Sequence, residues 1–498
     1  MLIDPTSGQP VDGAPLGALL SAQAHATPDA PALTFDAHTR TFRQLDEAAN
    51  RRARQLAGHN VAAGDNVVIA LDNRIEFLEC AFAAWKLGAV PCPVSNRLAP
   101  LEFETIVELA APKLILHDKA VSDEIGFTLE IDGPPPASLS AAPLPAAIAR
   151  PGKIVSSGGS TGRPKLIVDP LPSIWGPDKE LAGRPPRSTM LNASPLYHSG
   201  PFSIACCALA QGCHVICMEK FDPQGWLALV EQHRVSFAYI VPTIMTRIAK
   251  LDRDVTRRAD LSSLQALLHT AAPCPAATKL WWIERIGGRQ VLEIYGGSER
   301  IGATLIDGEE WSRHPGSVGR PMRGQTILIV DEAGVPLPSG EIGEVRFLRA
   351  PDAVDRYAYV GADAPPRSLD GFGDMGWLDD EGFLFIADRR TDMIVVGGVN
   401  VYPAEVEAAI EALPGVLGAA AIGLPDLDLG NRVHAIVELA DHAPVPDEAA
   451  FIARLRDRLS GFKLPRSIEF VRERIRDDAG KVRRAALRAE RIDVEART

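Results

Sequence analysis

The sequence predicts an α/β protein made of two unequal parts. Apolar strand-like runs alternate with helix-length segments over the first 300 residues, a pattern typical of folds built on mostly parallel sheets. The chain has 498 residues, which is too many for one ordinary domain. After Arg389 the pattern changes to a compact mixture of strands and helices. We therefore expect a large domain at 1–389 and a small α+β domain at 390–498.

The elements of the large part follow cap and turn signals. Thr41 is suited to cap a helix from Phe42 to Leu56, and Gly88 is suited to end a helix that begins at Glu76. Strands are expected at 31–35, 66–71, 89–94, 113–116, 215–218, 236–241, 266–269 and 290–294. Further helices are expected at 201–210, 223–233 and 242–250.

The second half of the chain carries hairpin signals before the small domain begins. Turn residues such as Gly334 and Gly382 separate β-rich runs within 318–350 and 371–389. The small domain is expected to hold a strand pair near 393–396, a helix at 403–412, strands at 417–423 and 433–439, a helix at 447–459 and a last strand at 467–471.

Composition and charge narrow the class of protein. Hydrophobic residues make up 46% of the chain and charged residues 23%, as in ordinary globular proteins. The net charge of −12 argues against nucleic acid as the main partner. The N-terminus lacks the basic and apolar regions of a signal peptide, and no run has the length and composition of a membrane span.

The seven cysteines indicate a reducing compartment, so we expect a cytoplasmic protein. They form no Cys-x-x-Cys pair. Four of them fall in the apolar segment 206–217. Buried free thiols are the expected interpretation there, and a metal site is the alternative.

The stretch from Ile154 to Val168 has the composition of a phosphate-binding loop. Its three glycines allow backbone N–H groups to approach an anion, four hydroxyl residues add donors, and Arg163 and Lys165 add positive charge. It lacks the Gly-Lys-Ser/Thr ending of the NTPase P-loop. β-branched residues follow Lys165, so a strand is expected to leave the loop. An ordinary Gly/Ser surface turn is the alternative.

The ordered motifs resemble those of the adenylate-forming superfamily, which comprises acyl- and aryl-CoA synthetases, adenylation domains and luciferases. The glycine loop is similar to the family's Thr-Ser-Gly-Thr-Thr-Gly-x-Pro-Lys-Gly. Asp388-Arg389 with Asp392 resembles the hinge, and Gly480-Lys481 resembles the C-terminal Thr-Gly-Lys. The resemblance covers essentially the whole chain. It implies a large domain of two α/β sheet halves plus a distorted β-barrel, with a mobile small domain.

The resemblance implies a two-step reaction in which ATP and a carboxylic acid form an acyl adenylate and CoA then displaces AMP. It assigns the phosphates of ATP to Ser157, Gly158, Gly159, Ser160, Thr161, Gly162 and Lys165. It assigns the adenosine and the α-phosphate to Ala271, Ala272, Pro273, Tyr295, Gly296, Ser298, Asp374 and Arg389. It assigns Mg²⁺ to Glu299 and catalysis to Lys481, His198 and Glu299, with His198 at the acyl pocket near the carboxylate. It assigns the path of CoA to Gly397, Gly398 and Lys463.

The chemistry explains why such residues are needed. Attack of a carboxylate on the α-phosphate brings two anions together, so cations must neutralise the charge. A carboxylate such as Glu299 is the hard oxygen ligand that Mg²⁺ prefers. Each residue also has an ordinary alternative: Asp374 as a turn residue, Glu299 as a surface carboxylate, His198 as a packed core histidine and Lys481 as one cation of a basic tail.

Several positions depart from the family pattern. Gly159 stands where Thr is usual and Leu166 where Gly is usual, as in ligases of bile-acid-like and other polycyclic carboxylates. Asp477 and Asp478 precede Gly480. Two carboxylates near Lys481 would raise its pKa. These changes leave two alternatives to a full ligase: an enzyme specialised for one half-reaction, such as thioesterification of a supplied adenylate, or a non-catalytic nucleotide- or acyl-binding relative.

The residues around the expected acyl pocket indicate the class of the carboxylic acid substrate. Small residues at Ser199, Gly200, Gly296, Gly297 and Gly302 predict a wide acyl pocket, and we expect a bulky apolar acid, polycyclic or otherwise. Basic residues outnumber acidic ones from 453 onward, which predicts either attraction for a phosphorylated ligand or a solvated face. A homodimer is a hypothesis taken from the family.

Overall fold

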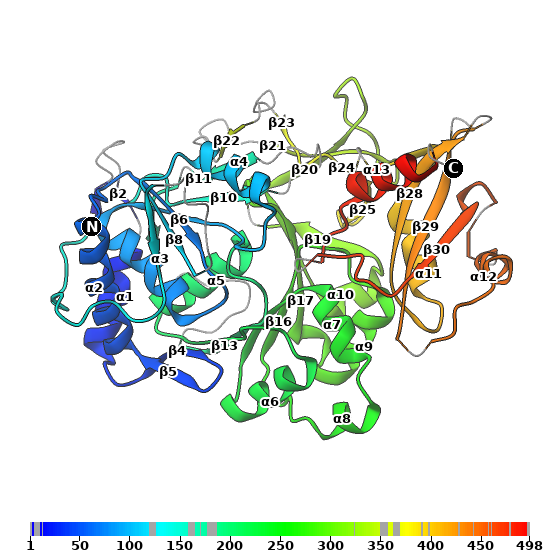
Figure 1. Cartoon of the computed structure of the whole chain (residues 1–498). Helices are drawn as coiled ribbons and strands as arrows, with labels where there is room; N and C mark the ends of the chain where they lie inside the picture. The colour runs from blue at the N-terminus through cyan, green and yellow to red at the C-terminus, as the bar shows by residue number, and fades with distance from the viewer. Residues whose placement is uncertain are drawn as a thin grey trace.

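The computed structural model describes the chain at residues 2–3, 10–11, 13–118, 126–157, 165–169, 171–176, 187–322, 324–348, 357–361, 369–389, 392–396, 399–426, 429–441, 443–456, 458–459, 461–477 and 480–495. Side chains are described over the same ranges except at 2–3, 10–11, 157, 369, 388–389, 399–400 and 493–495. Figure 1 shows a large domain, blue to yellow, beside a small domain in orange and red that contains the C-terminus.

A long sheet forms the centre of the large domain, and its first half is parallel as the sequence predicts. Six strands lie in the order β4-β14-β13-β15-β16-β17, all paired in parallel, with β5 added antiparallel at the edge. Their bounds are β4 (Pro31–Phe35), β5 (His38–Thr41), β13 (Thr189–Asn192), β14 (His214–Cys217), β15 (Phe237–Ile240), β16 (Ala266–His269) and β17 (Val291–Gly296).

The same sheet continues into antiparallel strands after β17. They are β18 (Ala303–Asp307), β19 (Ser317–Pro321), β20 (Thr326–Val330), β21 (Gly343–Leu348), β23 (Leu369–Asp370), β24 (Asp374–Leu378) and β25 (Leu384–Arg389). The resemblance implied a distorted barrel beside two α/β halves. The described strands instead join the predicted barrel region to the parallel strands through β18 and β19, so the parts share one hydrogen-bonded ladder.

A second, four-stranded parallel sheet lies near the N-terminus, in the order β7-β6-β8-β9. Thr41 caps α2 through a capping box with Gln44, and Gly88 ends α3 in the left-handed conformation, as predicted. The elements are α1 (Leu16–Ala26), α2 (Phe42–Gly58), β6 (Asn66–Ala70), α3 (Ile75–Leu87), β7 (Val90–Pro93), α4 (Pro100–Ala110), β8 (Leu114–His117) and β9 (Thr128–Glu130).

A three-stranded antiparallel sheet carries the predicted phosphate loop between two of its strands. β10 (Lys153–Ser157) pairs with β11 (Lys165–Asp169), and β11 pairs with β22 (Ala358–Val360). A strand therefore follows the loop, as predicted. Four short strands complete the inventory of this region: β1 (Leu2–Ile3), β2 (Pro10–Val11), β3 (Ala14–Pro15) and β12 (Ile174–Trp175).

Helices pack beside the central sheet, and those within residues 223–286 line a second apolar core. The helices beside the sheet are α5 (Ser199–Ala210), α6 (Pro223–His233), α7 (Pro242–Ala249), α8 (Arg253–Arg258), α9 (Ala276–Ile286), η1 (Gly288–Gln290) and α10 (Gly308–Arg313). Trp226 and Trp282 are fully buried in this core, with their ring centroids 5.7 Å apart. No described helix is long and apolar enough to cross a membrane.

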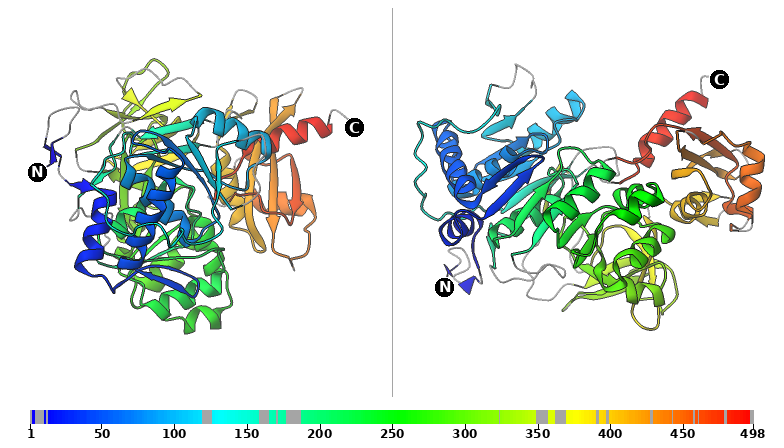
Figure 2. Two further views of the ribbon diagram at one scale, coloured as in Figure 1. Left: turned by 60° about the vertical axis from the view of Figure 1, so that its left-hand side comes forward. Right: turned by 90° about the horizontal axis from the view of Figure 1, so that it is seen from below.

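The small domain is an α+β unit with its own apolar core, and its predicted elements are present. They are β26 (Ile394–Val396), β27 (Val399–Val401), α11 (Pro403–Glu411), β28 (Val416–Asp426), β29 (Gly430–Leu439), α12 (Glu448–Leu455), η2 (Gly461–Lys463), β30 (Ser467–Val471) and α13 (Arg484–Glu495). The sequence analysis placed the end of α12 four residues too late and did not predict α13. Figure 2 shows this domain as a separate lobe against the large one.

The boundary between the domains near Arg390 stays a prediction, because residues 390 and 391 lie outside the described ranges. Side-chain contacts nevertheless join the two domains. The Lys250 Nζ donates to the carbonyl oxygen of Val416 at 2.6 Å, and the Arg483 guanidinium lies 3.9 Å from the Glu102 carboxylate. The small domain is therefore docked on the large domain in this arrangement.

Candidate active site

Glu299 lies in the turn between β17 and β18, where the sequence predicted the metal ligand. The Tyr359 hydroxyl donates to Glu299 Oε1 at 3.0 Å. Burial and the neighbouring Glu299 carboxylate raise the pKa of Tyr359 above its usual value, so the hydroxyl keeps its proton and remains a donor. A Cβ at Gly297 would lie 2.7 Å from Glu299 Oε2 and 2.5 Å from the Phe372 ring. Position 297 therefore accommodates only glycine without a shift of these side chains.

Lys165 begins β11 and lies beside the same tyrosine. Its Nζ lies 3.8 Å from the centroid of the Tyr359 ring, within the range of a cation–π interaction. The rest of the predicted phosphate loop, from Gly158 through Gly159, Ser160, Thr161 and Gly162 to Pro164, lies outside the described residues, as does the Ser157 side chain. The structure thus places one predicted phosphate ligand and leaves the others as predictions.

The carboxylate of Asp169 joins the hairpin of β10 and β11, which carries the predicted phosphate loop, to the turn that contains Glu299. Asp169, at the end of β11, accepts from Lys153 Nζ at 2.7 Å and from Arg300 Nε at 2.9 Å. Arg300 has φ +54°, in the left-handed region, which lets the chain reverse immediately after Glu299. The ends of two separate sheets are therefore held at one buried carboxylate.

The predicted ribose site is assembled from residues far apart in the sequence. The Tyr295 hydroxyl donates to Asp374 Oδ2 at 2.5 Å, and Asp374 is only 6% exposed. Asp374 opens β24 directly after Gly373, which has φ +79°. Asp374 and Arg389 are register partners on β24 and β25, although the Arg389 side chain is not described. These contacts place the two predicted nucleoside residues Tyr295 and Asp374 side by side.

The predicted adenine wall follows β16. Ala271 and Pro273 are exposed, so this segment presents an open apolar surface. Ala271 has φ +79°, an uncommon conformation for a residue with a Cβ. The predicted neighbours Gly296 and Ser298 follow Tyr295 at the end of the adjacent strand, β17, which pairs in parallel with β16.

A buried charged group supports the ends of these two strands. Lys279 on α9 donates to Glu293 on β17, and His269 Nε2 lies 3.9 Å from Glu293 Oε2. Burial lowers the pKa of His269 to about 4, so the imidazole is neutral at neutral pH. His269 and Glu293 are register partners, so this contact ties β16 to β17 just before the predicted adenosine residues.

The segment of the small domain that contains Gly480 and Lys481 lies close to this wall. Gly480 has φ +77°, and a Cβ there would lie 2.9 Å from Thr243 Oγ1 and 3.8 Å from the Ala272 Cβ. Asp477 shapes the turn, because its carboxylate accepts from the backbone N–H of Lys481 at 2.9 Å. Asp477 thus has a local structural role that the sequence analysis did not predict. We name residues 480–481 the Lys481 turn; it lies so close to Thr243 that a Cβ at Gly480 would clash with the threonine hydroxyl.

The acyl region around His198 contains aromatic rings. His198 precedes α5, and its ring centroid lies 4.5 Å from that of Tyr197. Three of the glycines expected to widen a pocket are covered: Gly200 faces the Tyr239 hydroxyl, Gly297 faces Phe372 and Gly302 faces Phe347. Rings therefore lie where these three glycines leave room, and the width of the acyl pocket stays a prediction.

The loop before His198 is held by a residue that the sequence analysis missed. Asn73 accepts from the backbone N–H of Leu196 at 2.8 Å and donates to the carbonyl oxygens of Ser194 and Met218. Tyr359, Phe372 and Arg300 were missed as well. Each acts through pairing across distant segments, which a linear motif does not reveal.

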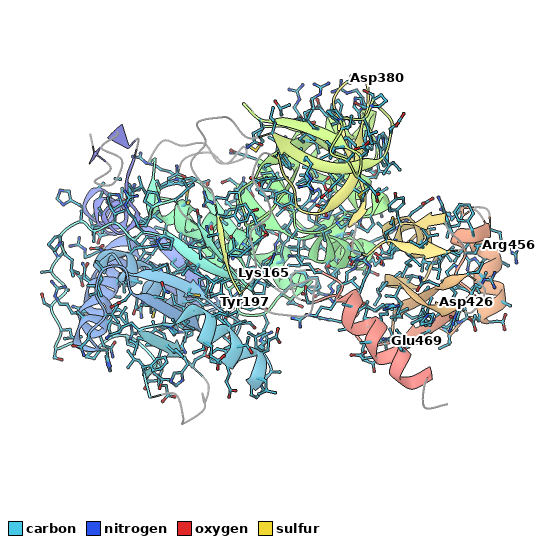
Figure 3. The ribbon with its side chains drawn as sticks, turned by 90° about the horizontal axis from the view of Figure 1, so that it is seen from above. Lys165, Tyr197, Asp380, Asp426, Arg456 and Glu469 are labelled. Atoms are coloured by element: carbon cyan, nitrogen blue, oxygen red, sulfur yellow. The ribbon has the colours of Figure 1, made fainter. Side chains whose placement is uncertain are left out.

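The residues predicted to meet CoA lie in the small domain. Lys463 Nζ pairs with the Glu405 carboxylate at 2.6 and 2.7 Å, and η2 packs beside β27. Gly397 and Gly398, which precede β27, lie outside the described residues. Figure 3 shows Lys165 in the middle of the molecule and Glu469 in the small domain.

The basic C-terminal segment proved to be internally paired at several positions. Arg476 pairs with Glu411, Arg484 with Asp392 and Glu407, and Arg491 with Glu469. Neither predicted role, an anion-attracting cap or a solvated face, describes these arginines. They instead hold the last helix and the Lys481 turn onto the small domain.

The cysteines behave as the favoured interpretation predicts. None of the seven forms a disulfide, and the four between 206 and 217 are buried. Burial raises the pKa of Cys206 well above its usual value, so its thiol stays protonated. Among the described residues no group of three or more potential metal-ligating side chains occurs.

Comparisons with known proteins agree with this geometry. The AMP-binding enzyme family matches residues 20–351, and the AMP-binding enzyme C-terminal domain matches residues 405–481. A feruloyl-CoA synthase of an Amycolatopsis species is 31% identical over 492 residues, which cover 95% of this chain and 98% of the relative. A long-chain-fatty-acid–CoA ligase of Mycobacterium tuberculosis is 30% identical over 480 residues, which cover 90% of this chain and 92% of the relative.

A solved structure shares the fold over nearly the whole chain. It is the o-succinylbenzoate CoA synthetase of Bacillus subtilis in complex with its acyl-adenylate intermediate, with a TM-score of 0.82 and 25% identity, covering 96% of this chain and 98% of that one. The chain therefore belongs to the AMP-binding enzyme family, and it is an AMP-forming ligase of the acyl-CoA synthetase branch.

Proposed function

We propose that this chain converts a carboxylic acid and ATP into an acyl adenylate and pyrophosphate, and then transfers the acyl group to CoA with release of AMP. One observation carries the proposal. A Cβ built at Gly480 in the Lys481 turn would lie 2.9 Å from Thr243 Oγ1 and 3.8 Å from the Cβ of Ala272, which follows β16. β16 pairs with β17, which carries Tyr295, and Tyr295 donates to Asp374. This proximity supports the proposal that the Lys481 cation acts beside the predicted adenosine residues, as adenylation requires.

In this proposal the chain's own residues divide the adenylation step among them. Asp374 accepts hydrogen bonds from the ribose hydroxyls, and Lys165 binds the β- and γ-phosphates of ATP. The Lys481 ammonium lies between the attacking carboxylate and the α-phosphate, where it offsets the repulsion between the two anions. His198 is expected to contact the acid. The Tyr295 hydroxyl fixes the orientation of the Asp374 carboxylate at 2.5 Å, so the ribose meets a preset acceptor.

The groups at the Glu299 turn suit Mg²⁺. The ion favours one or two carboxylates together with substrate phosphates. Glu299 supplies a carboxylate, and it lies near Lys165 because both side chains contact Tyr359. Bound there, Mg²⁺ would neutralise charge on the phosphates of ATP.

The second step is proposed to follow rotation of the small domain about the hinge at 388–392. Rotation would withdraw Lys481 and bring Gly397 and Gly398 toward the thiol of CoA. Lys463 is proposed to lie near the same path, beside β27.

For the acid we propose an apolar carboxylic acid. The first candidate is a bulky polycyclic acid, because Gly159 and Leu166 resemble the residues of ligases that act on bile-acid-like carboxylates. The rings that cover Gly200, Gly297 and Gly302 favour a flatter aromatic acid, which is the second candidate. The similarity to a feruloyl-CoA synthase supports this second candidate.

We also infer a cytoplasmic site of action. The support is that the seven cysteines remain thiols, as in proteins of reducing compartments. A homodimer stays a hypothesis for which size-exclusion chromatography with light scattering is the test.

The test of the proposed function measures two reactions in parallel. Pyrophosphate release is followed with ATP, Mg²⁺ and a panel of polycyclic, aromatic and fatty acids, and thioester formation is followed with CoA and synthetic acyl adenylates. We expect both reactions, with one acid class preferred. Thioester formation without pyrophosphate release would show an enzyme of the second half-reaction alone, and failure of both would contradict the proposal.

A further inference from the structure

The Tyr359 side chain contacts both Glu299 and Lys165. It lies on β22, the outer strand of the phosphate hairpin sheet, opposite Ile167 of β11. Its hydroxyl donates to Glu299 Oε1 at 3.0 Å, and its ring face lies 3.8 Å from Lys165 Nζ. The Glu299 carboxylate therefore contacts the hydroxyl of Tyr359, and the Lys165 ammonium contacts its ring face.

The surroundings of Tyr359 differ from those of its neighbour Tyr357. Tyr357 packs against the apolar cluster that contains Ile301 and Phe347, as a core aromatic residue does. Tyr359 is half-buried between the exposed residues Ala358 and Val360, and its contacts are with charged groups. The ring of Tyr357 meets that of Tyr359 edge to face at 5.1 Å, which limits the positions that Tyr359 can adopt.

We propose that Tyr359 is a positioning residue that orients the Glu299 carboxylate for Mg²⁺ and holds Lys165 toward the phosphates of ATP. The inference rests on the proposed function, because Glu299 and Lys165 take their roles from it. Carboxylates that bind metals are commonly held by a hydrogen bond from a second residue, and loss of such a partner weakens metal binding 10- to 100-fold. The ring face holds the lysine ammonium by a separate interaction.

The two contacts can be removed one at a time. Tyr359→Phe removes the hydroxyl and keeps the ring, whereas Tyr359→Leu removes both. Tyr357→Phe is the matched control, since it deletes the hydroxyl of the adjacent tyrosine on the same segment. Glu299→Gln reports whether the carboxylate binds metal at all.

The readouts are Mn²⁺ binding to the protein–ATP complex by electron paramagnetic resonance, ATP affinity by calorimetry with and without Mg²⁺, and the Mg²⁺ concentration for half-maximal ATP–pyrophosphate exchange. For Tyr359→Phe we expect about tenfold weaker Mn²⁺ binding and about a tenfold higher Mg²⁺ requirement. Its metal-free ATP affinity and its KM for the acid should match wild type. Tyr359→Leu should additionally lose about threefold in metal-free ATP affinity.

The outcomes distinguish failure of the positioning role of Tyr359 from failure of the proposed function. If Glu299→Gln shifts the metal dependence and Tyr359→Phe does not, the positioning role is overturned while the proposed function stands. If Glu299→Gln also leaves metal binding unchanged, the metal assignment of the proposed function fails and the inference fails with it. Should Tyr359→Leu not fold, Tyr359→Phe and Tyr357→Phe still decide the question.

Discussion

The two sides of the candidate site are built differently. On the large-domain side, charged groups are held by side chains of other elements: Glu299 by Tyr359, and Asp374 by Tyr295. On the small-domain side, the Lys481 turn is shaped by Asp477 of the same segment, and a Cβ at Gly480 would meet Thr243 of the large domain. The first side is held by contacts within the large domain, whereas the second belongs to the domain that we propose rotates between the two steps. Such a division suits an enzyme with two steps.

The largest expected effect tests whether Lys481 acts in only one step. Lys481→Ala should slow acyl adenylate formation about 10²- to 10³-fold, because a charge that stabilises the transition state is lost. Thioester formation from a supplied adenylate should change less than about threefold on the same reasoning. Both rates are measured separately, with the exposed neighbour Arg474→Ala as control. Equal loss in both steps would remove the distinction between the two sides.

The second prediction concerns the stability of the large-domain side. The folded pKa of His269 is about 4, below the unfolded value of about 6.5, so the unfolded state binds the extra proton as pH falls. The stabilisation is present above pH 6.5 and is lost between there and pH 4. We expect a loss of about 2 kcal/mol in unfolding free energy between pH 7 and pH 5 from this residue.

Tryptophan fluorescence during urea unfolding measures this loss in the correct domain, because all seven tryptophans precede residue 390. His269→Gln is expected to be less stable at pH 7 but to show a shallower decline toward pH 5. An unchanged slope would mean that other groups cause the acid sensitivity.

The third prediction concerns the docking of the Lys481 turn. Gly480→Ala should slow adenylation about tenfold, because the new methyl group meets Thr243 Oγ1 at 2.9 Å and the left-handed conformation costs about 1–2 kcal/mol. Gly430→Ala is the matched control, since Gly430 has φ +76° in the same domain and no atom within 4 Å of the added Cβ. Equal rates in the two variants would show that contact with Thr243 is unimportant.

The smallest expected effect concerns the contact between Lys250 and the carbonyl oxygen of Val416. Lys250→Met should reduce the adenylation rate about two- to threefold, since one hydrogen bond to a charged donor contributes modestly. The exposed Lys113→Met serves as control. A rise in the adenylation rate would instead indicate that this contact opposes the docked state.

Local signals in the sequence determined the secondary structure and the order of the motifs. Thr41 with Gln44 specifies a helix start, and β-branched residues after Lys165 specify a strand, because both depend on neighbours in the chain. The resemblance to the adenylate-forming superfamily implied roles for Asp374, Glu299 and Lys481. The residues that hold these groups were not indicated.

Only the tertiary structure decided which side chains meet. Tyr359 and Glu299 are separated by 60 positions, and Tyr295 and Asp374 by 79, so no local pattern links them. The glycines at 200, 297 and 302 show the same limit, since the sequence gives their small size and the fold supplies the rings that fill the space. Local conformation is a property of adjacent residues, whereas a site is a property of surfaces that folding brings together.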